Sequence, residues 1–222
     1  IAESPFIPQI MCEKMPNIEV ILSYDYNDIV EITDTSLSMC LKLREFWWLG
    51  DKPLAVFDPK AFNNNPFLQY FIVDAKQLTS FPPTLFENCP NMLSFSTMSS
   101  VTEIPHGFFK NPPSHNIGFQ NCSLSQLHSL SFGDLDKLAI IDVPYNQITS
   151  MDIRVFNRAR NLREFKASGN ICINKNFNDF ASNREANMEE LRGCFEAFGI
   201  VNRGETFFII FVKSNKTLKL AN

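Results

Sequence analysis

The amino-acid sequence predicts a curved α/β solenoid, with about seven parallel strands on its concave side. Two observations carry this prediction. Phenylalanine recurs at Phe62, Phe86, Phe108, Phe132 and Phe156, at intervals of 24, 22, 24 and 24 residues. About six residues after each of them comes a short alternation of apolar residues, typical of a strand with one buried face. A period of this length is the signature of stacked repeats.

The composition excludes several classes of protein. The chain has 222 residues, of which 45% are hydrophobic and 20% charged, and its net charge is -4. This balance gives no general attraction for nucleic acid or for anionic lipid. The longest uninterrupted apolar run, Phe207 to Val212, is far shorter than the roughly 18 residues of a membrane span. We therefore expect neither nucleic-acid binding nor membrane insertion.

The repeats share one internal pattern. Its clearest copies are LAIIDVPYNQI at 138–148 and LREFKASGNIC at 162–172, which both read LxxLxLxxNxL. The apolar residue at the fourth position of this pattern falls at 22, 46, 71, 95, 117, 141 and 165, which predicts seven turns. In the first turn this register places Leu22 and Tyr24 inward, and Ile21 outward.

The pattern resembles the leucine-rich repeat family over about residues 15 to 175. The resemblance implies short, irregular convex segments and a convex spine of stacked phenylalanines. It also implies an inward Asn in each turn that hydrogen-bonds the backbone of neighbouring loops. Asn27, Asn146 and Asn170 fit that role, Cys122 fits weakly and Lys76 does not. We therefore expect the Asn column to be interrupted near residue 76.

A C-terminal cap follows the last repeat. Met188, Leu191, Phe195 and Phe198 recur at helical spacing, which predicts an amphipathic helix over about 179–198. In extracellular members of the family such caps are tied to the repeats, which implies a disulfide between Cys172 and Cys194. The cap is also similar to those of secreted leucine-rich repeat proteins of flies and mosquitoes, some of which act in humoral immunity.

The other four cysteines divide into two pairs. Cys12 and Cys40 are the corresponding disulfide candidates at the N-terminal end, because adjacent turns could bring them within reach. Cys89 and Cys122 are inward by register and are either buried free thiols or a further bridge. With no CxxC motif, a zinc site is not expected.

Two disulfides would indicate folding in an oxidising compartment, so we expect a secreted, extracellular protein. Two glycosylation sequons agree with secretion and begin at Asn121 and Asn215. Asn121 lies beside an inward residue, which favours Asn215 as the site that is used.

The predicted organisation has four parts. They are an N-terminal cap at 1–18, repeats at 19–171, the cysteine cap at 172–198, and a terminal strand or hairpin at 199–222. The last part contains the apolar stretch Glu205 to Val212. It either packs on the cap, which we favour and which leaves a monomer, or pairs with another chain in a homodimer.

No catalytic or cofactor motif is present. His106, His115 and His128 belong to no nucleophile, metal or phosphate motif, and we interpret them as solvated loop residues. We expect a non-catalytic protein without a cofactor.

The family resemblance implies a binding site on the concave face, where partners of leucine-rich repeats usually bind. The register places an apolar group outward on its N-terminal half, bordered by acidic residues. The group is Trp47, Leu49, Tyr70, Ile72 and Met98, and its rim is Asp25, Glu45 and Asp74.

An apolar centre with a polar rim is typical of a protein interface. Two other interpretations stay open. Residues 1–9 could cover the group, or a register slip of one residue could exchange Trp47 and Trp48. We expect recognition of a protein partner, in arthropod immunity or extracellular signalling; the alternative function is a self-associating structural or matrix protein.

Overall fold

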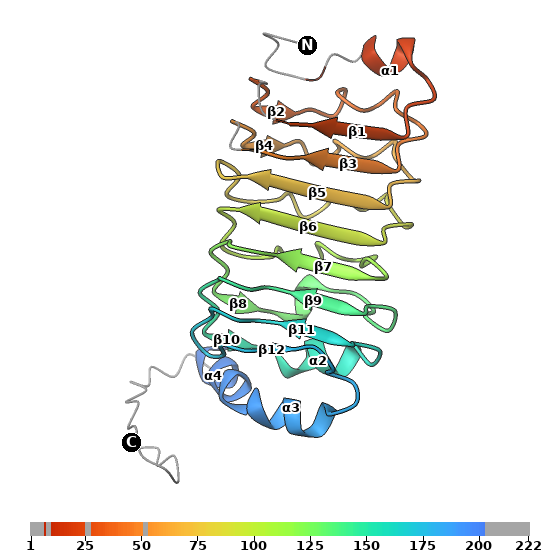
Figure 1. Cartoon of the computed structure of the whole chain (residues 1–222). Coiled ribbons are helices and arrows are strands. Elements are labelled where there is room, and N and C mark those ends of the chain that lie inside the picture. Colours follow the sequence, from red (N-terminus) through yellow and green to blue (C-terminus); the bar gives the residue numbers. More distant parts are fainter. Residues whose placement is uncertain (1–6, 8–9, 25–27, 51–52, 203–222) are drawn as a thin grey trace.

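The computed structural model shows a solenoid whose turns stack in one column (Figure 1). It describes residues 7, 10–24, 28–50 and 53–202. One sheet of eight strands runs the length of the column. In spatial order the strands are β1 (Val20–Ser23), β3 (Glu45–Trp48), β5 (Tyr70–Ala75), β6 (Ser94–Ser99), β7 (Asn116–Phe119), β9 (Ile140–Asp142), β11 (Glu164–Lys166) and β12 (Asn176–Phe177). The first seven are parallel, as predicted, and β12 adds antiparallel to β11.

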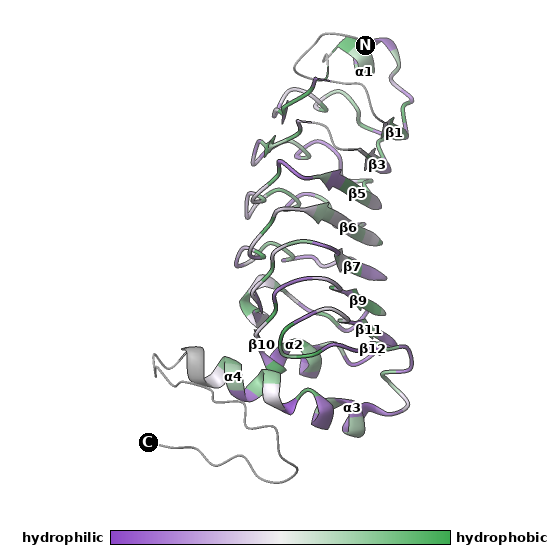
Figure 2. Ribbon diagram, turned by 60° about the vertical axis from the view of Figure 1, so that its left-hand side comes forward, coloured by the Kyte–Doolittle hydropathy of each residue, from purple (hydrophilic) through white to green (hydrophobic). Residues whose placement is uncertain are grey.

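The segments on the opposite side of the column are short and irregular, as predicted (Figure 2). It holds two small parallel sheets, a 3-10 turn and one short helix. These elements are β2 (Glu31–Ile32) with β4 (Val56–Phe57), β8 (Gln126–Leu127) with β10 (Ser150–Met151), η1 (Ser129–Ser131) and α2 (Ile153–Arg158). A further short helix, α1 (Ile10–Lys14), lies at the N-terminal end.

Stacked phenylalanines fill the space between the two sides. The spine residues of the sequence pattern, Phe62, Phe86, Phe108, Phe132 and Phe156, are all buried. Strand phenylalanines form a second column beside them: the rings of Phe46 and Phe71 are stacked at 5.7 Å, and those of Phe71 and Phe95 at 5.3 Å. Offset stacking at these distances adds to the free energy of apolar burial. The high phenylalanine content therefore serves the core.

The predicted register is wrong in the first turn. Ile21, not Leu22, pairs with Phe46, so Ile21 packs on the core while Leu22 and Tyr24 face outward. Val20, Leu22 and Tyr24 are 49%, 48% and 62% exposed. The segment VILSY offers apolar residues at nearly every position, so alternation could not fix its register. Ser23 pairs with the buried Trp48.

The inward asparagines act as predicted where the structure describes them. The Nδ2 of Asn146 donates to the carbonyls of Phe119 at 2.7 Å and Val143 at 3.1 Å, and its Oδ1 accepts from the Leu124 amide. Asn170 makes the equivalent contacts one turn later. Asn27 lies outside the described residues.

Two further inward polar side chains contact backbone carbonyls of the neighbouring turns. The thiol of Cys122 takes the asparagine place beside the carbonyls of Thr97 and Gln120. Asn65 was missed: it is fully buried and donates to the carbonyls of Leu37 and Cys40. Its position in the repeat, three residues before the first Leu, matches that of Cys40, and this was the signal available.

The cap contains two helices, so the expected single helix over about 179–198 is wrong. Residues 179–183 form turns, followed by α3 (Arg184–Glu190) and α4 (Arg192–Asn202). The chain changes direction at the buried Leu191. This bend lets Cys194 reach Cys172 and places α4 against β10.

The two expected disulfides, Cys12–Cys40 and Cys172–Cys194, are both present. Cys89 and Cys122 are buried free thiols. The start of the expected terminal segment, 199–202, continues α4, whereas the stretch Glu205 to Val212 and the sequon at Asn215 lie outside the described residues.

Asp152 ties α2 to the preceding turn. Its buried carboxylate caps α2 by accepting from the Arg154 amide at 3.0 Å, and it accepts from the Ser129 amide at 3.3 Å. The guanidinium of Arg154 lies 2.8 Å from the same carboxylate. Burial alone raises the pKa of Asp152, but the hydrogen bonds from Arg154 and Ser129 outweigh it and hold the pKa at about 2.

We expect Asp152 to make stability depend on acid pH. Because its pKa is lower in the folded state, its stabilising effect is complete above about pH 4 and is lost as the pH falls toward 2. Asp152→Asn should therefore lose on the order of 1–2 kcal/mol of unfolding free energy at pH 7 and little at pH 2. Urea titrations at several pH values measure this difference.

Asp136→Asn is the control, because Asp136 forms an exposed ion pair with Arg160. This substitution should change the free energy of unfolding at pH 7 less than Asp152→Asn does. Equal losses at pH 7 and pH 2 for Asp152→Asn would contradict the assignment.

Candidate functional site

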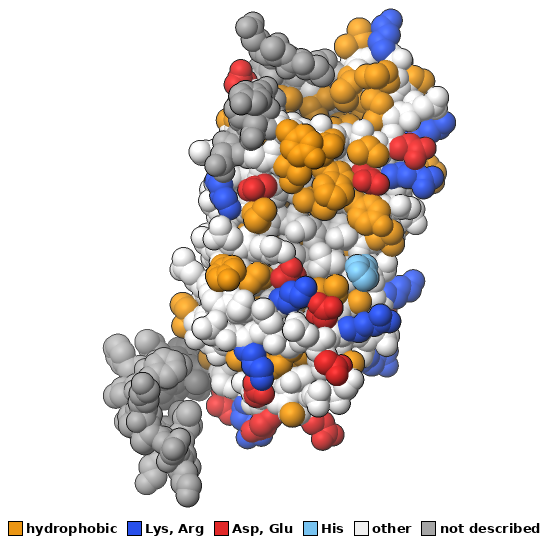
Figure 3. All heavy atoms as spheres, viewed as in Figure 1, with side chains coloured by type: hydrophobic (Ala, Val, Ile, Leu, Met, Phe, Trp, Pro, Cys, Tyr) orange, Lys and Arg blue, Asp and Glu red, His pale blue; other side chains and the backbone are white. Residues whose placement is uncertain are grey.

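The outward side chains of the sheet form the candidate site. Along β3, β5 and β6, buried residues alternate with half-exposed ones. The parallel register places Leu22 beside Trp47, and Trp47 beside Ile72. We call the resulting surface the apolar patch; it consists of Val20, Leu22, Tyr24, Trp47, Leu49, Tyr70, Ile72 and Met98. Figure 3 shows hydrophobic side chains gathered over β1, β3 and β5.

The orientation of the two tryptophans follows the predicted register. Trp48 is buried, with 1% of its surface exposed, and stacks near Phe46. Trp47 is half-buried on the outward face, where its Nε1 donates to the Glu45 carboxylate at 2.9 Å. The alternative in which the two exchange places is therefore excluded. The hydrogen bond favours this orientation of the Trp47 indole.

The acidic residues expected at the rim lie at the borders of the patch. Glu45 is the neighbour of Tyr70 across the strands, and Asp74 that of Met98. Lys76 lies 3.9 Å from the Asp74 carboxylate. Asp25 lies outside the described residues.

The C-terminal half of the sheet face is polar. Glu164 and Lys166 form an ion pair at 3.0 Å on β11, and Gln120 donates to Asp142 on the neighbouring strand. Burial raises the pKa of Asp142, although Lys166 and Gln120 partly offset it. The charged and apolar halves are visible in Figure 3.

Sequence reasoning missed Val20, Leu22 and Tyr24 as members of the patch. They became outward residues only when the register of the first turn was corrected. The signal that could have found them was the spacing: from Ile21 to Phe46 and from Phe46 to Phe71 the interval is 25 residues.

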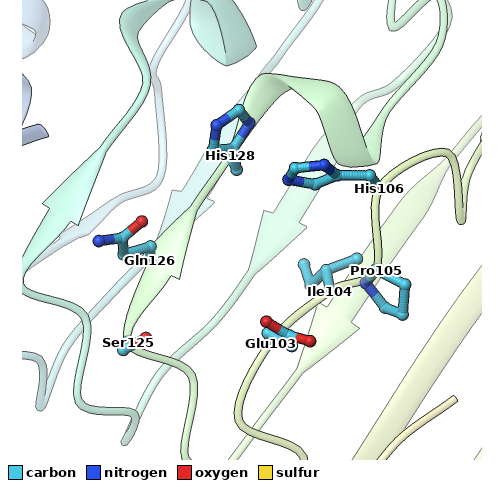
Figure 4. Close-up of a pocket in the computed structure, with 7 residues that line it drawn as sticks. All are labelled: Glu103, Ile104, Pro105, His106, Ser125, Gln126 and His128. Atoms are coloured by element: carbon cyan, nitrogen blue, oxygen red, sulfur yellow. The ribbon is translucent and has the colours of Figure 1, made fainter. Parts of the chain in front are cut away.

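A pocket on the other side of the column brings two histidines together (Figure 4). It has a volume of about 280 Å³ and is lined by Glu103, Ile104, Pro105, His106, Ser125, Gln126 and His128. The two imidazole rings, expected as solvated loop residues, lie 4.8 Å apart in adjacent turns. Burial lowers the pKa of His128, and His106 lowers it further. The Nδ1 of His128 accepts from the Leu130 amide and caps η1.

The chemistry of this pocket is limited. Because the Nδ1 of His128 already accepts a hydrogen bond, the proton of the neutral ring belongs on Nε2, which removes the lone pair that a metal would need. In the part of the chain that the structure describes, no group of three or more His, Cys, Asp or Glu could hold a metal ion. The pocket contains no nucleophile paired with a base.

The remaining residues singled out in the sequence are the sequon residue Asn121 and the free cysteines Cys89 and Cys122. Asn121 is exposed, with a left-handed φ of 48°, so its side chain is accessible although Cys122 beside it is buried. Burial raises the pKa of the Cys89 thiol to about 12 and also raises that of Cys122. Both thiols are therefore poor nucleophiles.

The comparison with protein families agrees with the repeat architecture. The BspA type leucine rich repeat region matches in six copies, over residues 11–117 and 55–187. Matching solved structures include the leucine-rich repeat domain of APL1B, which is 16% identical, with a TM-score of 0.39 and coverage of 77% of this chain and 67% of that one. No curated protein matches this chain. Among the described residues no helix is long and apolar enough to cross a membrane.

The family match spans well over half of the chain and coincides with the stacked turns of the sheet. The chain therefore belongs to the leucine-rich repeat family, as a repeat region of the BspA type.

Proposed function

We propose that this chain is a non-catalytic recognition module that binds a protein partner through the apolar patch. Leucine-rich repeat domains commonly bind proteins. The observation that carries the proposal is the set of aromatic side chains on the sheet face, Tyr24, Trp47 and Tyr70. The core does not need them, since Phe46 and Phe71 fill the inward positions. Exposed aromatic residues grouped on one face are the usual anchors of protein interfaces.

The scaffold supports this role by holding the patch rigid. Strand pairing fixes the backbone under Trp47, and the bond to Glu45 fixes its ring. A surface ordered before binding loses little conformational entropy when the partner arrives. Glu45 and Asp74 at the border favour a partner with basic residues around an apolar centre.

Two features support an extracellular location. The chain has two disulfides, which persist in oxidising compartments, and an exposed sequon at Asn121. We extend the proposal to a secreted protein of arthropod immunity or extracellular signalling, because the cap sequence is similar to those of secreted fly and mosquito proteins.

Trp47→Ala tests the proposed site. We expect the affinity for a partner captured from the native extracellular fluid to fall by about 10- to 100-fold or more, because a central aromatic anchor contributes about 2 kcal/mol or more. Surface-immobilised binding measurements with the purified partner give this ratio. Thermal melting should show a folded variant, since Trp47 is outside the core.

Ile153→Ala is the matched control: Ile153 is 43% exposed on α2, away from the sheet, and its removal should leave affinity unchanged. A folded Trp47→Ala variant with full affinity would rule out the patch as the binding site.

A further inference from the structure

Glu45 lies between three members of the apolar patch. Its neighbours across the strands are Val20 on β1 and Tyr70 on β5, and Trp47 follows it on the same face of β3. Val20 is 49% exposed, whereas the side chains of Glu45, Trp47 and Tyr70 are half-buried. The Glu45 carboxylate therefore has apolar or aromatic side chains as its immediate neighbours on this face of the sheet.

Glu45 differs from the other outward carboxylates in its partner. Among the described residues, it accepts a hydrogen bond from the neutral indole of Trp47, through Oε2, and forms no ion pair. Arg44, which precedes it, forms an ion pair with Glu19 instead. The other outward carboxylates that the structure describes on the sheet each lie beside a cation or an amide: Asp74 beside Lys76, Asp142 beside Gln120, and Glu164 beside Lys166.

The charge of Glu45 and part of its hydrogen-bonding capacity are thus left for a partner. A carboxylate offers about four lone-pair sites on its two oxygens, and the Trp47 indole uses one of them, on Oε2. Half-buried apolar surroundings strengthen the attraction between a carboxylate and a cation, because less water screens the charges. A positively charged donor therefore suits this position better than a neutral one.

We propose that Glu45 binds the guanidinium group of an arginine side chain on the protein partner. This inference deepens the proposed function and rests on it, since it names the chemistry that the apolar patch recognises. The methylene groups of the arginine pack on Trp47 and Tyr70, while its N–H groups donate to the Glu45 carboxylate.

The surroundings of Glu45 favour arginine over lysine. A guanidinium group is planar and more weakly hydrated than an ammonium group, so it enters apolar surroundings more readily and packs well on aromatic rings. Both rings available here, those of Trp47 and Tyr70, belong to residues adjacent to Glu45 on the sheet. The five N–H donors of arginine can also bond to the carboxylate while some remain in water.

The two tryptophans of the chain provide the readout for a test. The indole N–H of Trp47 donates to Glu45, whereas Trp48 is buried. In an NMR titration, the peptide acetyl-Leu-Arg-Leu-amide should shift the Trp47 indole signal and leave that of Trp48 in place. Its dissociation constant should be at least about 10-fold lower than that of the matching glutamine peptide. It should also be lower than that of the lysine peptide.

Glu45→Gln removes the charge and keeps an oxygen that can accept from the Trp47 indole. In this variant the preference for the arginine peptide over the glutamine peptide should fall to less than about 2-fold. Glu164→Gln is the matched control, because Glu164 lies on the polar half of the sheet face and pairs with Lys166. It should keep the full preference. Thermal melting should show that both variants are folded.

The outcomes separate this inference from the proposed function. Equal affinities for the arginine and lysine peptides, or a preference for arginine that survives Glu45→Gln, would overturn the arginine site. If all three peptides shift the Trp47 signal with equal affinity, the patch binds apolar chains without arginine, and only the present inference fails. If no peptide shifts this signal, the arginine site is also overturned, and Trp47→Ala with the captured partner decides the proposed function.

Discussion

Phe71→Ala should lower the free energy of unfolding by about 3–5 kcal/mol, one of the two largest effects we expect in this chain. Phe71 is fully buried in the middle of β5. Its ring lies 4.9 Å from that of Phe86 and 5.3 Å from that of Phe95. Alanine would leave a cavity that neighbouring rings, held by strands on both sides, could not fill. Urea denaturation followed by circular dichroism measures the loss.

Phe67→Ala is the matched control, because Phe67 precedes the same strand but is 53% exposed. Its removal should change the free energy of unfolding by no more than about 0.5 kcal/mol. Similar losses for the two variants would show that β5 does not pack as described.

Removing the Cys172–Cys194 disulfide should lower the free energy of unfolding by about 2–5 kcal/mol, and it should destabilise mainly the cap. The bridge joins the last repeat to α4, whose Phe195 lies 5.5 Å from the spine residue Phe156. In Cys172→Ser/Cys194→Ser, the amides of α4 should lose protection before those of β5 and β6. Hydrogen exchange with mass spectrometry resolves these segments.

The double variant Cys12→Ser/Cys40→Ser is the matched control at the other end of the column. It should deprotect α1 and leave the amides of α4 unchanged. Uniform loss of protection along the chain in either variant would indicate that the caps and repeats unfold as one unit.

The repeated core was predictable because each turn reuses the same positions. The spacing of Phe62 and Phe86 indicates the length of the repeat. The alternation of apolar and polar residues around Phe71 and Phe95 predicts which side chains point inward. The same register placed Trp47 outward, and the structure agrees. Prediction failed in the first turn because VILSY satisfies the apolar pattern in two registers, and only pairing with β3 selects one.

The cap could be predicted only in part, because its shape depends on tertiary contacts. Helical spacing continues through Leu191, so the pattern gave no sign of the bend there. The bend follows from burial of Leu191 and from the position of Cys172, to which Cys194 must reach. His106 and His128 are 22 residues apart, which is one turn, but the contact between their rings depends on side-chain orientation that spacing does not specify.

The alternation of buried and outward residues on β3, β5 and β6 has an evolutionary consequence. Inward residues such as Phe46 and Phe95 are constrained by packing, whereas Trp47, Ile72 and Met98 lie between them and support little of the core. Substitutions at the outward positions should therefore be nearly neutral for folding. Related chains could acquire different binding preferences by changing every second residue of a strand, without first evolving a new or more stable scaffold.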